Sequence, residues 1–423
     1  MPSTRLTRYI VIGLVLGIAS GYLCYLYFPE SSPRFAEIAS LLPTAFLRLI
    51  KMIIAPLVFS TLVVGIAKMG DIATVGRIGG KALGWFIFAS LVSLTLGLVL
   101  VEYFEPGKAI QLPIPEATAS SGIQANALSL QGFIEHTIPT SLIDSMARNE
   151  ILQIVVFSLF FGTAMAALGE RSKPVIAVLD ATSHIMLKVT GYVMWFAPLA
   201  VFGALAHTVA ERGLDILRVY GIFMGEFYLA MLLLWVALAL LGSIFLGRRV
   251  LSLLRRVREP VILAFSTASS EAAYPKTLEE LERFGCSNRI SSFVLPMGYS
   301  FNLDGSMIYC TFAVMFIAQV YGIELSIGQQ FLMVAILMLT SKGIAGVPRA
   351  SLVVIAATLA QFNIPEAGLL LLLGIDHFLD MGRSATNVIG NSIATAVVSR
   401  WEGELMSQAD ADAAAEQRLA AHA

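Results

Sequence analysis

The sequence predicts an all-α polytopic membrane protein, and its composition and apolar pattern both indicate this fold class. Hydrophobic residues make up 57% of the 423 residues and charged residues only 13%, whereas a soluble domain carries roughly 25% charged residues. Apolar runs that are long enough to cross a bilayer, which takes about 20 residues, recur along the first part of the chain. In the last third the apolar segments are shorter and are broken by polar residues.

Six apolar runs are predicted membrane spans, and we place them near 9–28, 43–67, 82–103, 151–168, 175–206 and 217–247. The first run follows Arg5 and Arg8 without a small-residue cleavage site, so we expect an uncleaved span. The loop 104–150 is rich in Ser, Pro and Gly, and we expect it to face outward as a connector.

Basic residues fall in alternate loops and therefore predict the orientation of the chain. They are Arg5, Arg8, Lys68, Arg77, Lys81, Arg171, Lys173, Arg248, Arg249, Arg255, Arg256 and Arg258. By the positive-inside rule these loops and the N-terminus lie in the cytoplasm.

Charge and cysteine usage exclude several classes of partner. The net charge of -1 provides no basic field for nucleic acid. Cys24, Cys286 and Cys310 are far apart, and the five histidines show no metal-ligand spacing. We therefore expect no cofactor and no metal beyond a coupling ion.

Two polar breaks in the last third predict the tips of re-entrant hairpins. One break covers 266–271 and the other covers 341–351, between apolar arms at 331–340 and 352–360. Each of these arms is about half a bilayer long at ~1.5 Å per residue. Non-helical backbone at such depth must line a cavity or be buried in protein, and paired breaks of this kind indicate a transporter's binding site. Two ordinary surface loops are the alternative.

The apolar helix predicted over 366–400 carries one polar stripe. Its members are Asp376, Asp380, Arg383, Asn387 and Asn391. At ~100° per residue they fall within an arc of about 80°, and charges in a bilayer are costly, so this stripe must face protein or water. The planar fork of Arg383 suits a carboxylate and Asp380 suits an ammonium, which together describe an acidic amino acid. Mutual neutralisation of Asp380 and Arg383 is the alternative.

A third break at 300–306 predicts a cation site. Asn302 and Gly305 favour leaving the helix, and unwinding frees carbonyl groups beside Asp304. These oxygen atoms suit a monovalent cation. The alternative is a glycine kink with a hydrogen-bonded aspartate.

Four motifs occur here in the order that is seen in the dicarboxylate/amino acid:cation symporter, or glutamate transporter, family. They are the Ser-Ser-Glu tip at 269–271, Asn302-Leu303-Asp304-Gly305-Ser306, Gly343-Ile344-Ala345-Gly346-Val347-Pro348 and Asp380-Met381-Gly382-Arg383-Ser384-Ala385-Thr386-Asn387. The resemblance covers nearly the whole chain and is closest to the bacterial proton–glutamate symporters.

This resemblance implies a homotrimer with eight membrane helices and two opposed hairpins in each subunit. A transport part would move through a scaffold as an elevator. The first two helices, 1–81, would be mainly scaffold, and the third helix, 82–104, would be transport part. The region 105–257 would contribute to both, 258–401 would be the transport core, and 402–423 a cytoplasmic tail.

The family's site residues carry over by motif position. Arg383 would bind the substrate's side-chain carboxylate and Asp380 its ammonium. The other carboxylate would meet Asn387 and backbone at Ser269, Ser270 and Gly346, while Ser306 and Ser384 would supply hydroxyls. The second hairpin tip would be the extracellular gate, with Gly343, Ala345, Val347, Pro348 and Arg349.

Departures from the family pattern bear on the coupling ion. Sodium-coupled members resembling this chain place a carboxylate where it has Asn391 and adjacent Thr-Ser where it has Ala89-Ser90. Both changes favour protons, although Asn302 and Asp304 leave one sodium site open.

Two further departures concern a proton carrier and a missing arginine. The proton-carrying glutamate of animal members corresponds here to Cys310, so Glu271 is our first candidate and Asp304 the second. An arginine found at the positions of Ala268 or Met381 in relatives is absent here. Arg349 either replaces it near the site or is an exposed tip residue.

Three other functions compete with this interpretation. A C4-dicarboxylate carrier would look similar through both hairpins, but such members tend to lack an acid at Asp380 because their substrate has no amine. An intramembrane hydrolase would need a histidine paired with a nucleophile, and a channel would need a ring of like groups. We therefore expect a carrier in a bacterial inner membrane, with both termini cytoplasmic and lipid as its surroundings.

Overall fold

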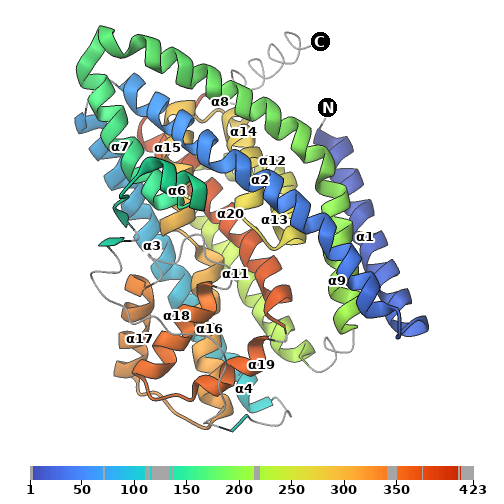
Figure 1. The fold of residues 1–423 in the computed structure, drawn as a ribbon. Coiled ribbons are helices and arrows are strands. Elements are labelled where there is room, and N and C mark those ends of the chain that lie inside the picture. The colour runs from blue at the N-terminus through green and yellow to red at the C-terminus, as the bar shows by residue number, and fades with distance from the viewer. Residues whose placement is uncertain are drawn as a thin grey trace.

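A computed structural model shows an almost entirely helical chain (Figure 1). The structure describes residues 3–69, 72–109, 115–116, 134–135, 137–213, 220–340, 350–373, 375–407 and 410. Six helical stretches of this part are apolar and long enough to cross a membrane. The predicted all-α membrane fold is therefore confirmed at this level.

Seven long helices make up the first part of the chain. They are α1 (Ser3–Tyr27), α2 (Ser32–Met69), α3 (Ile72–Phe104), α7 (Ile151–Leu168), α8 (Lys173–Val193), α9 (Ala197–Arg212) and α11 (Gly221–Leu246). The short helices α4 (Pro106–Ala109) and α6 (Leu142–Arg148) lie in the predicted outward loop. Figure 1 shows α1 along α9, and α2 alongside α8.

The prediction of one span over 175–206 is wrong in detail. A 3-10 turn at Met194–Phe196 separates α8 from α9. Pro198 stands in the first turn of α9, where a proline needs no hydrogen-bond partner for its nitrogen. The proline therefore begins a new helix here.

The last third consists of shorter elements. They are α12 (Arg249–Arg256), α13 (Arg258–Thr267), η3 (Glu271–Ala273), α14 (Tyr274–Phe284), α15 (Asn288–Phe301), α16 (Asp304–Val320), α17 (Ile327–Thr340), α18 (Ala350–Gln361), η5 (Glu366–Gly368), α19 (Leu369–Leu373) and α20 (Asp376–Trp401). Two pairs of short helices, α13 with α14 and α17 with α18, occupy the predicted hairpin arms.

One predicted break is confirmed and one predicted helix is shorter than expected. Helix α15 ends at Phe301 and α16 begins at Asp304, so the chain leaves the helix at the predicted place. The helix expected over 366–400 instead begins at Asp376, where a carboxylate in the first turn favours the positive helix terminus.

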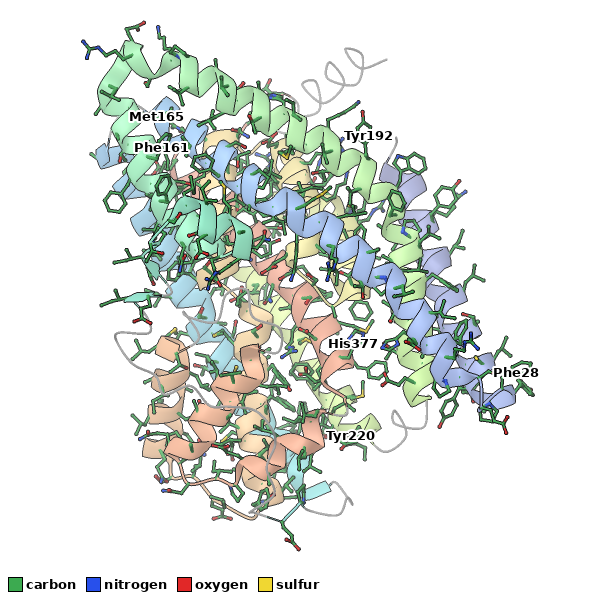
Figure 2. All side chains as sticks on the ribbon, viewed as in Figure 1. Phe28, Phe161, Met165, Tyr192, Tyr220 and His377 are labelled. Carbon is green, nitrogen blue, oxygen red and sulfur yellow. The ribbon has the colours of Figure 1, made fainter. Side chains whose placement is uncertain are left out.

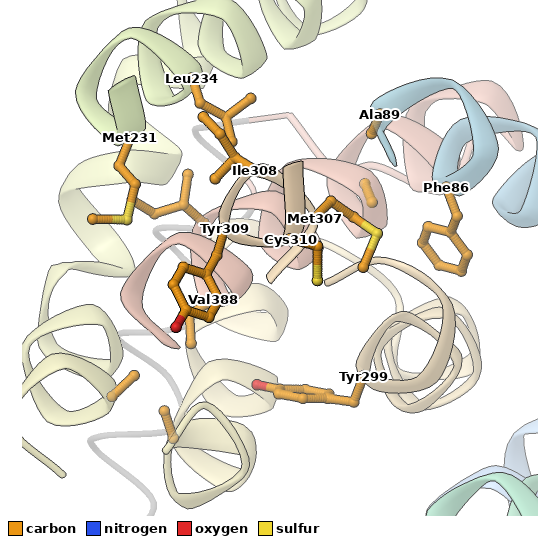
Figure 3. Packing of buried hydrophobic residues seen from close by; sticks show 14 of the residues in the cluster. Phe86, Ala89, Met231, Leu234, Tyr299, Met307, Ile308, Tyr309, Cys310 and Val388 are labelled. Atoms are coloured by element: carbon orange, nitrogen blue, oxygen red, sulfur yellow. The ribbon is translucent and has the colours of Figure 1, made fainter. Parts of the chain in front are cut away.

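Helix α16 lies at the centre of this part of the molecule. All of its residues except Gln319 are buried. Figure 3 shows Tyr309 and Cys310 of α16 among side chains from α11, α3 and α20, including Met231, Phe86 and Val388. Polar groups on α16 therefore lie in a setting that contains little water.

The outer helices carry apolar side chains into their surroundings. Phe28 and Tyr192 project from the periphery of the molecule (Figure 2) and are 63% and 61% exposed. Exposed aromatic side chains on apolar helices suit lipid, so these surfaces agree with a membrane-embedded chain.

The segment after α20 packs against the body of the protein. Glu402 forms ion pairs with Arg77 at 2.9 Å and Lys81 at 2.6 Å, and hydrogen bonding from Arg77 lowers the pKa of Glu402. Glu404 pairs with Arg289, and the Met406 N–H donates to the Gly285 carbonyl. Distant basic residues therefore hold Glu402–Met406 against the body of the protein.

Candidate functional site

The polar stripe of α20 faces the neighbouring helices, as the sequence predicts. Arg383, Asn387 and Asn391 are all buried, and contacts from these side chains reach α15 and α16. The stripe therefore lies inside the protein and not against lipid.

Four side chains form a charged cluster at the start of the stripe. Arg383 Nη2 lies 2.9 Å from Asp380 Oδ1 and 3.3 Å from Asp376 Oδ1. The Tyr309 hydroxyl donates to the same Asp376 oxygen at 3.1 Å, and the Tyr309 ring lies 4.1 Å from the guanidinium carbon. Two carboxylates and one ring face thus surround a single guanidinium group.

This cluster keeps capacity for a further anion. The Arg383 side chain is 3% exposed, and its Nε and Nη1 atoms have no hydrogen-bond partner in the described part of the chain. A buried donor without a partner costs about 1–3 kcal/mol or more, and an incoming carboxylate would satisfy both nitrogen atoms. The Asp380 side chain, by contrast, is 38% exposed, so an incoming ligand can reach it.

A second polar cluster includes Asn391, about two turns after Arg383 along α20. Asn302 Nδ2 donates to Asp304 Oδ2 at 3.0 Å and to Asn391 Oδ1 at 3.2 Å. The Ser93 hydroxyl of α3 lies 3.2 Å from Asp304 Oδ1. These carboxylate, amide and hydroxyl oxygens are the ligands that hard cations prefer, and Asp304 alone can hold a proton. The cluster therefore suits a small monovalent cation or a proton.

The two clusters are joined by residues of the same helices. Asn387 Oδ1 accepts the Gly305 N–H at 2.9 Å, so this amide fixes the start of α16. Ser306 and Ser384 are buried near these ends of their helices, and Ser90 is buried one turn before Ser93 in α3. The predicted residues of the Asn302–Ser306 motif, of the last motif and of the third helix therefore converge in space.

Gly390 and Gly305 allow the close approach that this convergence needs. A Cβ atom at Gly390 would overlap Asp304 Oδ2, and one at Gly305 would overlap the Arg383 backbone. Only glycine leaves room at these two crossings, so α16 and α20 can share one buried polar layer.

The first hairpin tip is a closed turn between α13 and η3. The Ser269 N–H donates to the Ala264 carbonyl at 3.1 Å, because Ala268 adopts a left-handed conformation that closes the turn. This amide therefore bonds within the tip, and substrate binding by the backbone at Ser269 stays a prediction. The Ser270 N–H has no hydrogen bond in the described part of the chain.

Glu271 begins the η3 turn at the first hairpin tip. No contact among the described residues joins Glu271 to Asp380 or Arg383. Its role as a proton carrier stays a prediction.

The second hairpin tip lies outside the described residues. This applies to the predicted residues Gly343, Ala345, Gly346, Val347, Pro348 and Arg349. The flanking helices α17 and α18 lie near α16 and α3 (Figure 1).

Sequence reasoning gave no role to three residues of the site. Asp376 was visible as a member of the stripe, but its position beside Arg383 was not. Tyr309 follows Ser306 by three residues and Ser93 follows Ser90 by three, so both lie on the face of a predicted residue. That spacing is the signal that could have found them. Within the described residues no cluster of three or more His, Cys, Asp or Glu side chains suits a metal ion.

Buried ionisable groups on apolar helices indicate a membrane protein with an internal functional site, such as the pathway of a transporter. The chain belongs to the sodium:dicarboxylate symporter family, whose family model matches residues 6–401. The chain is thus a symporter, as its motif order predicts.

Relatives with two different names match at the same level. The chain is 39% identical over 405 residues to a C4-dicarboxylate transport protein of Bacillus subtilis strain 168, covering 95% of this chain and 94% of the relative. It is 39% identical over 412 residues to a proton/sodium-glutamate symport protein of Geobacillus stearothermophilus, covering 96% of each. A C4-dicarboxylate transport protein of Laribacter hongkongensis is also 39% identical, over 416 residues, covering 96% of this chain and 92% of the relative.

Proposed function

We propose that this symporter imports acidic amino acids, glutamate or aspartate, together with protons. The observation that carries the proposal is Arg383, which is buried beside the accessible carboxylate of Asp380 and has two nitrogen atoms without a hydrogen-bond partner among the described residues. Arg383 would bind the side-chain carboxylate and Asp380 the ammonium of one substrate molecule. The site would be completed by Asn387, Ser306, Ser384 and the backbone at Ser269, Ser270 and Gly346.

Import of a C4-dicarboxylate is the second candidate. Two of the relatives above carry that name, and Arg383 would serve succinate, fumarate or malate equally well. Such a substrate has no amine, however, and would meet the carboxylate of Asp380 with repulsion. This favours the amino acid.

Replacing Asp380 with serine separates the two candidates. If the substrate carries an ammonium, the variant should bind glutamate and aspartate about 10- to 100-fold more weakly. This factor corresponds to the free energy of one charge-assisted hydrogen bond. Competition by succinate should persist or improve. Binding is measured by competition against a labelled substrate.

A matched control is Asp144→Asn, which breaks the exposed pair of Asp144 with Arg148 and should change nothing. Unchanged glutamate affinity in the Asp380→Ser variant, with the protein still folded, would exclude an ammonium contact at this position.

The proposal includes the elevator arrangement that the family resemblance implies. Each subunit of a homotrimer would have eight membrane helices and two hairpins. Residues 1–81 would belong mainly to the scaffold, and 82–104 with 258–401 would belong to the transport part. The region 105–257 would serve both parts, and 402–423 would lie in the cytoplasm of a bacterial inner membrane. Native mass spectrometry of the purified protein would refute the trimer by showing another dominant assembly.

For coupling, we propose protons, with Asn302, Asp304, Ser90 and Asn391 retaining one possible sodium site. The amide of Asn391 weakens a sodium site because it supplies no negative charge. Uptake into proteoliposomes under separately imposed sodium and proton gradients tests this, and uptake driven by sodium alone would refute it.

Glu271 is the proposed proton carrier. Replacing Glu271 with glutamine should make uptake insensitive to an imposed pH gradient while substrate exchange at constant pH continues. The expected loss of pH drive is complete, because glutamine cannot exchange a proton. Full pH-driven uptake in this variant would remove the assignment and leave Asp304 as the candidate.

A further inference from the structure

Exposed arginines form a stripe at the end of α11. Arg248, Leu251 and Arg255 follow one another at spacings of three and four residues, which places them on one face of α12. Arg258 begins the next helix. All four side chains are exposed, and we call them the arginine stripe. The opposite face of α12 is buried through Val250 and Leu253.

The stripe has free positive charge. In the described part of the chain, none of its three arginines has a carboxylate within ion-pair distance or a side-chain hydrogen bond. Acidic residues at this end of the protein are engaged elsewhere, since Glu402 pairs with Arg77 and Glu404 with Arg289. Three guanidinium groups therefore remain available to an anion.

An exposed apolar ridge on α11 leads directly to this stripe. Its members are spaced by three or four residues and are Leu229, Leu232, Val236, Leu240 and Ile244. Exposure is high where the ridge approaches the stripe, with Leu240 at 63% and Ile244 at 71%. Only the short turn at Gly247 separates the ridge from Arg248. The molecule thus presents an apolar column that ends in positive charge.

We propose that the arginine stripe binds the headgroup of an anionic phospholipid, whose acyl chains lie along the α11 ridge. The loop charges place this end of α11 at the cytoplasmic face, where anionic lipids attract basic segments. Guanidinium forks bind phosphate oxygens in pairs. The ridge adds a second requirement, because a ligand that lies along it must carry a long apolar chain. No soluble phosphate has such a chain.

The site has a consequence for the hairpin that follows. Helix α12 joins α11 to α13, the first arm of the first hairpin, and Arg258 belongs to that arm. A lipid held by the stripe would therefore contact both the last predicted long span and the hairpin. This inference does not depend on the identity of the transported substrate.

The test compares lipid retention by the whole purified protein. Protein in detergent is incubated with equal amounts of phosphatidylglycerol and phosphatidylcholine that have the same acyl chains, and retained lipids are counted by native mass spectrometry. The wild type should prefer phosphatidylglycerol. Replacing Arg248, Arg255 and Arg258 with glutamine should reduce that preference about five-fold for each arginine.

A control variant removes the same charge elsewhere on the predicted cytoplasmic side, through Arg8→Gln, Arg171→Gln and Lys173→Gln, and should keep the preference. A lysine variant of the three arginines keeps the charge and should retain most of the binding, which guards against misfolding of the glutamine variant. The proposal fails if the wild type shows no preference, if both glutamine variants lose it equally, or if inorganic phosphate displaces the lipid.

Discussion

Replacing Arg383 with glutamine should abolish binding of glutamate, aspartate and succinate alike. All three candidate ligands carry carboxylates, and we assign to one carboxylate the two guanidinium nitrogen atoms that have no partner among the residues the structure describes. Losing a charged partner in a buried site costs about 2–5 kcal/mol, which corresponds to affinity losses of about 30-fold or more. Calorimetry on the purified variant measures this directly.

The Arg383→Gln variant should also be less stable, and a double variant separates the two effects. Removing Arg383 leaves Asp376 as a buried charge without its partner, which costs about 3–5 kcal/mol. Adding Asp376→Asn removes that charge and should restore much of the melting temperature, because Tyr309 can still donate to the asparagine. Binding should remain absent. A double variant that regains both stability and substrate binding would show that Arg383 is only structural.

Replacing Gly390 with alanine should disrupt ion coupling. The added methyl group would overlap Asp304 Oδ2 and push this carboxylate away from Asn302 and Ser93. Overpacking of a core costs about 1–3 kcal/mol, so the protein should fold but with a displaced carboxylate. We expect uptake driven by an ion gradient to fall about ten-fold or more, since 1.4 kcal/mol corresponds to a factor of ten.

The control for Gly390→Ala is Gly84→Ala in α3. Nothing lies within 4 Å of a Cβ built at Gly84, and alanine favours a helix by about 1 kcal/mol over glycine. This variant should transport normally and melt slightly higher. Normal ion-driven uptake in Gly390→Ala would contradict the assignment of the Asp304 cluster to coupling.

The polar layer between α16 and α20 was largely predictable because the membrane restricts where polar residues can lie. A charged group facing lipid is costly, so the spacing of Arg383, Asn387 and Asn391 predicted which face of α20 is internal. The break after Phe301 was also predictable from its polar and glycine residues. Non-helical backbone at this depth in a membrane must be buried in protein or line a cavity.

Contacts between segments far apart in the chain were not predictable. Ser93 contacts Asp304, and Glu402 forms an ion pair with Arg77. No local sequence pattern links the residues of either pair. The start of α20 at Asp376 was also missed, because the apolar run before it continues the helical pattern. The role of Glu271 rests on motif position alone and stays a prediction.

The central claim is that Arg383 and Asp380 hold a small molecule that carries two carboxylates and one amine. Isothermal calorimetry of the purified protein with glutamate, aspartate and succinate, in the presence and absence of sodium and at several pH values, tests it most directly. The account predicts saturable binding of glutamate or aspartate that strengthens as the pH falls and weakens in the Asp380→Ser variant. Absence of binding by every acidic amino acid and dicarboxylate under all of these conditions would contradict it.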